Sequence, residues 1–158
     1  MDKLIWELTY KLSDDTKIKD LEKIAGISLP SDYIDCVLEN NEGYPSLKVF
    51  KTQRGVKHIF NNLLSLDESE DENVFKTYQF IFEEMERKDI IPFARDSFGN
   101  YICFDFSESA GKVVFWDNET NTLDVVSETF TELIDMLSYA EQHIIIINFY
   151  FFHIERRL

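Results

Sequence analysis

The sequence predicts an α+β fold, in which helices pack against one antiparallel β-sheet (a meander) within a single domain. Three observations support this prediction: an early pair of helix-like segments, a later run of four short strand-like segments, and a last helix-like segment. The chain has 158 residues, of which 44% are hydrophobic and 15% are aromatic. This length and composition suit one domain with one core.

The first helix is predicted from apolar spacing and from residues typical of helix ends. Ile18, Leu21 and Ala25 recur at i, i+3 and i+7, the spacing of one buried helix face. A serine and an aspartate at positions 13 and 14 are candidate N-caps. Gly26 is the glycine expected just past the C-terminal end.

A second helix and several strands are predicted next. Pro30 opens a helix over residues 31–40, because its missing N–H would be unpaired in a first turn in any case. Residues 43–66 contain no acidic side chain and indicate a hairpin or strand pair around residues 53–55. A further short strand is expected at 63–66.

An acidic segment at residues 67–72 follows and leads into a third helix. Its sequence, Asp-Glu-Ser-Glu-Asp-Glu, is typical of a solvated loop, and its charge favours the start of a helix through the helix dipole. The helix is expected over residues 73–87. Phe75, Tyr78 and Phe82 form its apolar stripe.

Four short strands joined by polar turns then indicate an antiparallel meander. They are expected at residues 90–94, 101–106, 113–116 and 123–126. Pro92 argues that the first of them has an edge or first-strand position. We expect Gly99 and Asn100 to take positive φ in the turn that precedes the second strand. Ser127 is the expected N-cap of the last helix.

Acidic residues dominate the charge, and they gather in the second half of the chain. The sequence holds 30 acidic and 16 basic side chains, a net charge of −14. Residues 67–141 alone contain 19 acids and 5 bases, which accounts for the whole excess. Such a surface repels a nucleic-acid backbone and attracts a basic protein. Alternatively, the excess of acidic side chains serves only to keep the protein soluble.

Residue types that carry catalysis or bind metals show no pattern typical of a site. The three histidines have no metal-ligand partner at i+3 or i+4. Asp96, Asp105, Asp117 and Glu119 cluster around the meander turns, but their spacing fits no calcium loop. We therefore prefer solvated turn carboxylates to a divalent-metal site. The expectation is a protein that is not an enzyme and holds no cofactor or metal.

The cysteines and the chain ends predict a cytoplasmic protein. Cys36 and Cys103 are expected as buried free thiols rather than a disulfide. The N-terminus lacks the basic and apolar regions of a signal peptide. The longest apolar stretches, 144–147 and 149–152, are too short to cross a membrane.

Four motifs, in order along the chain, resemble the SUKH superfamily in its Smi/Knr-like branch. They are Leu-Pro-Ser-Asp-Tyr at 29–33 with the helix before it, Asn-Asn-Glu-Gly at 40–43, Ile-Pro-Phe-Ala-Arg-Asp-Ser-Phe-Gly-Asn-Tyr-Ile-Cys-Phe-Asp at 91–105, and Ser-Glu-Thr-Phe-Thr-Glu-Leu-Ile at 127–134. Glu42 stands where the family has a glycine. The resemblance spans about residues 21–137 and implies a SUKH-like fold.

The resemblance also implies a binding role without catalysis. Bacterial members are immunity proteins of polymorphic toxin systems: they bind a cognate toxin, often a nuclease, and block it as an antitoxin would. Fungal members are regulatory interaction proteins, so a regulatory or scaffolding module without a toxin stays open as the alternative. The expected partner is a basic protein. Candidate partner-binding residues are Asp67, Glu68, Glu70, Asp71, Asp96, Asp105, Asp117, Tyr101 and Trp116.

The end of the chain lies outside the resemblance. We expect the SUKH-like domain at residues 1–142 and an apolar C-terminal extension at 143–158, whose isoleucines and phenylalanines favour β-structure. The extension must be covered, either by the same domain or in an oligomer contact. A monomer, with the extension covered by its own domain, and a homodimer, with the extension in the contact, are therefore both possible states.

Overall fold

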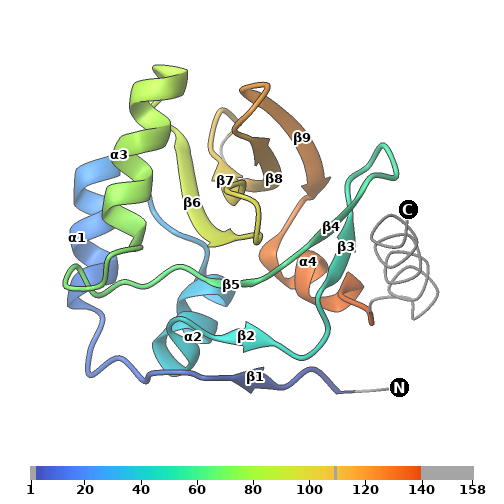
Figure 1. Ribbon diagram of the computed structural model, residues 1–158. Coiled ribbons are helices and arrows are strands. Elements are labelled where there is room, and N and C mark those ends of the chain that lie inside the picture. The colour runs from blue at the N-terminus through green and yellow to red at the C-terminus, as the bar shows by residue number, and fades with distance from the viewer. Residues whose placement is uncertain (1–2, 109, 140–158) are drawn as a thin grey trace, which may run out of the picture.

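The computed structural model describes residues 3–108 and 110–139. In these ranges the helices are α1 (Thr16–Ala25), α2 (Ser31–Asn40), α3 (Val74–Met85) and α4 (Phe130–Met136). The strands are β1 (Trp6–Glu7), β2 (Tyr44–Pro45), β3 (Val49–Lys51), β4 (Lys57–Ile59), β5 (Asn62–Leu63), β6 (Ile90–Arg95), β7 (Tyr101–Asp105), β8 (Lys112–Asp117) and β9 (Thr122–Ser127). Figure 1 shows α1 and α3 on one side of the molecule and α4 with the β3–β4 hairpin on the other.

The predicted α+β fold and its antiparallel meander are confirmed. The largest sheet has five antiparallel strands in the order β5-β6-β7-β8-β9. The structure differs from the expectation of one sheet, because β1 pairs with β2 and β3 pairs with β4 in two further sheets. Strands of two or three residues are too short to show the period-two pattern by which a strand is found in a sequence.

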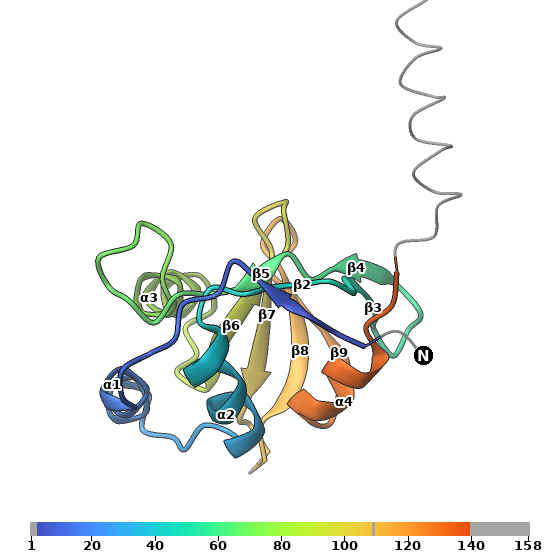
Figure 2. The same ribbon diagram turned by 90° about the horizontal axis from the view of Figure 1, so that it is seen from below.

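The five-stranded sheet carries buried side chains on both faces, because successive side chains of a strand point to opposite sides. Figure 2 shows α3 next to β6 and α4 next to β9. One face carries the larger core cluster, which includes Tyr33 of α2, Phe93, Phe104, Phe115 and Phe130 of α4. The other face carries a smaller cluster, which includes Ile81 of α3, Cys103, Val114 and Trp116. Helices α2 and α4 thus pack on the larger cluster, whereas α3 contributes to both, with Val74 and Tyr78 in the larger cluster and Ile81 in the smaller one.

Pro92 lies in β6, which has β5 on one side and β7 on the other, so the strand itself is not at an edge of the sheet. Pro92 is nevertheless paired only on the β7 side. Strand β6 pairs with β5 only at Ala94 and Arg95, and with β7 along its length. Strand β5 does not reach Pro92, and the residue after β5, Leu64, donates its N–H to the carbonyl of Phe93 at 2.9 Å. The pairing of β6 with β7 shifts register between Pro92 and Ala94, as in a β-bulge, where proline is tolerated.

The helix ends follow the sequence signals with two corrections. Helix α2 has the predicted bounds, and Gly26 ends α1 in the left-handed conformation with φ +69°. Ser127 is not the N-cap of α4. It closes β9, and the Thr129 side chain instead accepts the N–H of Glu132 at 3.1 Å. Gly99 has φ +84° as expected, but Asn100 is not among the positive-φ residues of the described chain.

One carboxylate joins the starts of two helices. Asp32, in the first turn of α2, accepts the N–H of Tyr33 at 2.9 Å through Oδ1. Its Oδ2 accepts the backbone N–H and the hydroxyl of Thr131, at 2.9 and 2.8 Å, at the start of α4. The shared acceptor fixes α2 and α4 relative to each other over one face of the sheet.

The predicted C-terminal extension, residues 143–158, lies outside the described residues, as does the oligomer contact proposed for it. The last described residues run beside β3, where Ser138 N–H donates to the carbonyl of Val49 at 3.0 Å. Across residues 3–108 and 110–139, no helix combines the length and apolar character that crossing a membrane requires.

Candidate functional site

Four of the predicted carboxylates, Asp67, Glu68, Glu70 and Asp71, lie together with Glu72 in one exposed segment, the acidic loop, which we define as residues 67–72. It connects β5 to α3 and contains Asp67, Glu68, Glu70, Asp71 and Glu72, all of them exposed. The loop has its own internal bonds: Asp67 Oδ1 accepts the N–H of Ser69 at 2.9 Å and its hydroxyl at 2.7 Å. These bonds stabilise the charged form and hold the pKa of Asp67 below its ordinary value.

The loop ends where α3 begins. Asn73 is buried and caps the helix by accepting the N–H of Lys76 at 2.9 Å. The Asn73 amide also donates to the carbonyl of Glu70 at 2.9 Å. One buried side chain therefore fixes both the first turn of α3 and the last part of the acidic loop.

A hollow of about 450 Å³ opens between the acidic loop and the chain before α1. Its lining includes three carboxylates, Glu42, Asp67 and Glu70, and two amines, Lys11 and Lys17. The amines are engaged with acids: Lys17 donates to Glu68 at 2.9 Å, and Lys11 lies 3.5 Å from Glu39. The bond to Glu68 raises the pKa of Lys17. The lining of the hollow thus contains three acids and two bases, and both bases are paired with carboxylates outside the lining.

Glu42 stands in the turn after α2 in a conformation that favours glycine. Its φ is +67°, which is sterically costly, about 1 kcal/mol, for a residue with a side chain. This finding accounts for the glycine that the resemblance leads one to expect at this position. The Glu42 carboxylate accepts the hydroxyl of Ser65 at 3.2 Å. Burial raises the pKa of Glu42, and the nearby Glu70 and Asp67 add to the increase.

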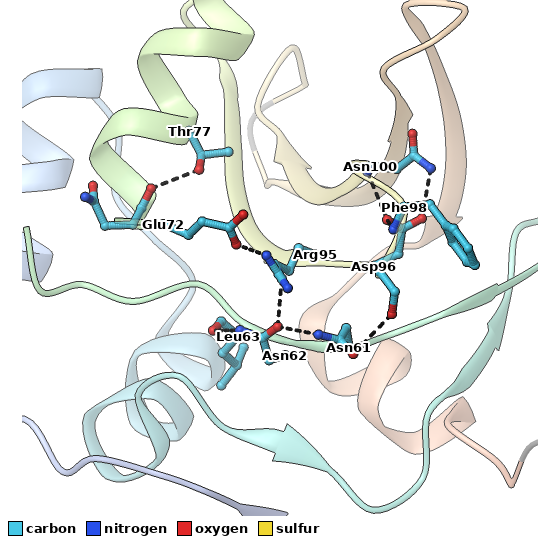
Figure 3. Close-up of polar contacts among 11 residues, drawn as sticks. Asn61, Asn62, Leu63, Glu72, Thr77, Arg95, Asp96, Phe98 and Asn100 are labelled. Atoms are coloured by element: carbon cyan, nitrogen blue, oxygen red, sulfur yellow. Dashed lines mark hydrogen bonds and ion pairs between the residues drawn. The ribbon is translucent and has the colours of Figure 1, made fainter. Parts of the chain in front are cut away.

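Arg95, the last residue of β6, links the acidic loop to the sheet. Its guanidinium pairs with Glu72, and its Nε donates to the side-chain oxygen of Asn62 at 2.9 Å (Figure 3). The same oxygen accepts the amide of Asn61 at 2.8 Å. Ser97 in turn donates to Asn61 at 3.2 Å, which continues the network into the β6–β7 turn.

The predicted residues of the meander do not form one surface. Asp117 lies at the β8–β9 turn and accepts the N–H groups of Glu119 and Thr120, at 3.0 and 3.2 Å. Asp105 lies at the opposite end of β7 from Tyr101, in a cluster with Arg87 and Asp89. The carboxylates of the meander turns are therefore split between the two ends of the sheet.

Asp96 and Asp105 are buried, at 4% and 6% exposure, and their carboxylates act within the fold. Asp96 accepts the N–H groups of Phe98 and Asn100 at 2.8 and 2.9 Å. Asp105 accepts from Arg87 and from the N–H of Ser107, both at 2.9 Å. Neither carboxylate offers a partner much surface.

The two aromatic residues expected as anchors are held by the sheet. Trp116 is 0% exposed in the smaller core cluster, and its Nε1 donates to Asn121 at 2.9 Å. Tyr101 is half-buried and stacks on Trp116 with ring centroids 6.2 Å apart. The aromatic side chain that is exposed at this end of the sheet is Phe98, which is 81% exposed in the β6–β7 turn and is not among the predicted residues. The one signal for it is an aromatic residue between Ser97 and Gly99, in a turn otherwise built from small and polar residues.

Of the two cysteines expected to be buried, Cys103 is buried and Cys36 is only half-buried. Burial raises the pKa of Cys36 to about 11 and that of Cys103 well above its ordinary value, and both are free thiols. His58 stacks on Phe115 at 3.7 Å, and burial lowers its pKa. His143 and His153 lie outside the described residues. Within the part of the chain that the structure describes, no group of three or more His, Cys, Asp or Glu side chains is arranged to hold a metal ion.

Comparison with known proteins gives a family match. Residues 13–136, more than half of the chain, match the model of the SMI1 / KNR4 family (SUKH-1). A search of curated proteins found no match. Among solved structures, a crystal structure of a protein from Pseudomonas syringae pv. tomato is similar over 70% of this chain and 72% of that chain, with 13% sequence identity and a TM-score of 0.46.

Proposed function

This chain belongs to the SMI1 / KNR4 family (SUKH-1), and we propose that it is a protein-binding domain without catalytic activity that neutralises a cognate toxin as an immunity protein. The observation that carries the proposal is the acidic loop with its hollow. Five carboxylates and no basic residue lie in six consecutive exposed positions. A nuclease toxin needs a basic cleft for the phosphates of its substrate, and an acidic loop matches such a cleft in sign.

The loop suits this role because it is held in shape before the partner arrives. Bonds from Ser69 and from the capping residue Asn73 order its backbone, and Arg95 holds its last residue. A surface that is already ordered loses less conformational entropy on binding than a flexible one. Beside it, Glu42, Asp67 and Glu70 offer oxygen acceptors for a lysine or arginine of the toxin.

The free thiols support a cytoplasmic location for this function. Cys36 and Cys103 are unpaired, which suits a reducing compartment, and we place the function in the cytoplasm.

The direct test is co-expression with the toxin domain encoded beside this chain. We expect the chain to restore growth and to bind the purified toxin domain in calorimetry. Affinity should fall steeply as salt is raised, because exposed charges are screened. The proposal fails if the neighbouring gene encodes no toxic domain, or if this chain neither binds that domain nor protects against it.

Charge neutralisation tests the loop itself. The double variant Glu70→Gln with Asp71→Asn should weaken binding about tenfold, chiefly through slower association. The matched control is Glu83→Gln with Glu84→Gln, which makes the same change in net charge at the other end of α3. Equal losses for both pairs would show that overall charge matters and that the loop does not.

A further inference from the structure

Phe98 is the most exposed of the large hydrophobic side chains in the described ranges. It is 81% exposed at the tip of the β6–β7 turn, whereas Phe93 and Phe104 of the same hairpin are fully buried. The core therefore gains almost nothing from this ring, and its hydration is unfavourable. Single exposed apolar residues are common on protein surfaces, so exposure alone assigns no role. Two further observations set Phe98 apart.

The first observation is that the turn is rigidly held (Figure 3). Buried Asp96 accepts the N–H groups of Phe98 and Asn100 through one oxygen and the Asn100 amide through the other, at 2.8 to 2.9 Å. Gly99 takes φ +84°, which lets the chain reverse, and the Asp96 N–H donates to the carbonyl of Asn100 at 3.1 Å. The backbone that carries Phe98 is thus fixed before any partner binds, which lowers the entropic cost of binding.

The second observation is the charge around the ring. The Asn100 side chain accepts the N–H of Asn118 at 3.0 Å, so the β8–β9 turn is bonded directly to the β6–β7 turn. Residues 96–100 and 117–121 contain no lysine or arginine, and of their three acids Asp117 is half-buried and Glu119 is exposed, whereas Asp96 is buried within the turn. An aromatic ring beside carboxylates does not suit a nucleic-acid strand, whose phosphates these turns would repel, nor an anionic membrane surface.

We propose that Phe98 is the aromatic anchor of this protein, and that it inserts into an apolar pocket bordered by lysine or arginine side chains on a basic protein partner. This inference rests on the proposed role as a protein-binding domain and names a second contact besides the acidic loop. Interfaces draw most of their affinity from a few well-packed aromatic or arginine residues, while surrounding charges govern encounter and orientation.

The experiment measures binding of the neighbouring toxin domain to full-length chain by calorimetry and surface plasmon resonance. Phe98→Ala should weaken binding at least about 30-fold, mainly through faster dissociation. Phe98→Tyr keeps the ring and should retain most of the affinity. Ile24→Ala is the matched control, since Ile24 is 62% exposed on α1. The melting temperature of each variant should stay within about 2 °C of that of the unmodified chain.

The outcomes separate this inference from the proposed function. If the unmodified chain binds the toxin domain and Phe98→Ala binds equally well, the anchor is disproved and the immunity role stands. If Phe98→Ala and Ile24→Ala weaken binding equally, the effect is not specific to this turn and the inference also fails. If the unmodified chain does not bind at all, both proposals are overturned.

Discussion

Arg95 at the end of β6 pairs with Glu72, the last residue of the acidic loop, and thereby fixes the exposed loop to the central sheet. The Arg95 side chain is 28% exposed and that of Glu72 is 55% exposed, so the ion pair is partly screened by water. Arg95 Nε donates to the side-chain oxygen of Asn62, which also accepts the amide of Asn61, and both of these bonds are partly buried. The arginine therefore stabilises the β5–β6 edge and the loop together.

Replacing Arg95 should loosen this junction. We expect Arg95→Ala to lower the free energy of unfolding by about 1 kcal/mol, because Asn62 loses its charged donor. Urea denaturation measures the change. Lys19→Ala, which removes an exposed pair with Asp15 at 3.5 Å, is the control and should have almost no effect. Equal effects of the two substitutions would contradict the structural role of Arg95.

Removing the hydroxyl of Tyr33 should stabilise the protein. Tyr33 is 0% exposed, and its hydroxyl has no hydrogen-bond partner among the described residues. Tyr33→Phe removes a buried polar group that gains no bond, so we expect the free energy of unfolding to rise by about 1 kcal/mol. The matched control is Tyr78→Phe, which deletes a 2.9 Å bond to the carbonyl of Lys88 and should destabilise by a similar amount. A loss of stability in both variants would show that the Tyr33 hydroxyl is paired in solution.

The ion pair of Arg87 with Asp89 should make the stability of the fold depend on pH. The bonds from Arg87 hold the pKa of Asp89 below its ordinary value of 3.8. A carboxyl whose pKa is lower in the folded state stabilises the fold above its unfolded pKa, and this stabilisation is lost as the pH falls through the folded pKa. Arg87→Met should therefore be less stable than the unmodified chain at neutral pH, and the difference should narrow below about pH 4. Urea titrations at pH 7 and pH 3 measure the difference in the free energy of unfolding between the variant and the unmodified chain. The same difference at both pH values would contradict a lowered pKa of Asp89 in the folded state.

The two thiols should be unreactive in the folded protein. With a pKa of about 11, the Cys36 thiol is ionised to about one part in a thousand at pH 8, and burial also raises the pKa of Cys103. We expect slow reaction of both thiols with a chromogenic disulfide reagent and rapid reaction of both in urea. Cys36→Ser should leave one slow thiol. A fast one-thiol phase under native conditions would show that Cys36 is more accessible than its burial indicates.

The parts of the fold that the sequence predicted are those with strong local signals. Pro30 and the polar residues at 40 and 41 delimit α2, Gly26 ends α1, and the turn residues at 53–55 separate β3 from β4. The N-cap of the last helix also has a local signal in the sequence. Thr129 and Glu132 have the spacing of a capping pair, in which the threonine caps the helix and the glutamate reaches back toward the preceding backbone, here to Glu128.

The parts that were missed depend on contacts between distant segments. Trp116 was expected at the surface because the sequence does not show that α3 covers the second face of the sheet. Asp96 and Asp105 look like solvated turn residues until their partners, the turn backbone and Arg87, are placed around them. The acidic loop could be found as a charge run, but the hollow beside it could not, since Glu42 reaches it from a segment before β2.

The carboxylate of Asp32, which serves the starts of both α2 and α4, also sets an order of events during synthesis. Its partner Thr131 lies 99 residues further along the chain. At a translation rate of about 10 residues per second, roughly 10 s separate the appearance of the two residues from the ribosome. Until Thr131 is made, Asp32 in the first turn of α2 lacks this hydrogen-bond donor. The ring of Tyr33 also lacks its contact with Phe130 until that residue is made. The domain therefore acquires the contact between α2 and α4 only after residue 131 has been made.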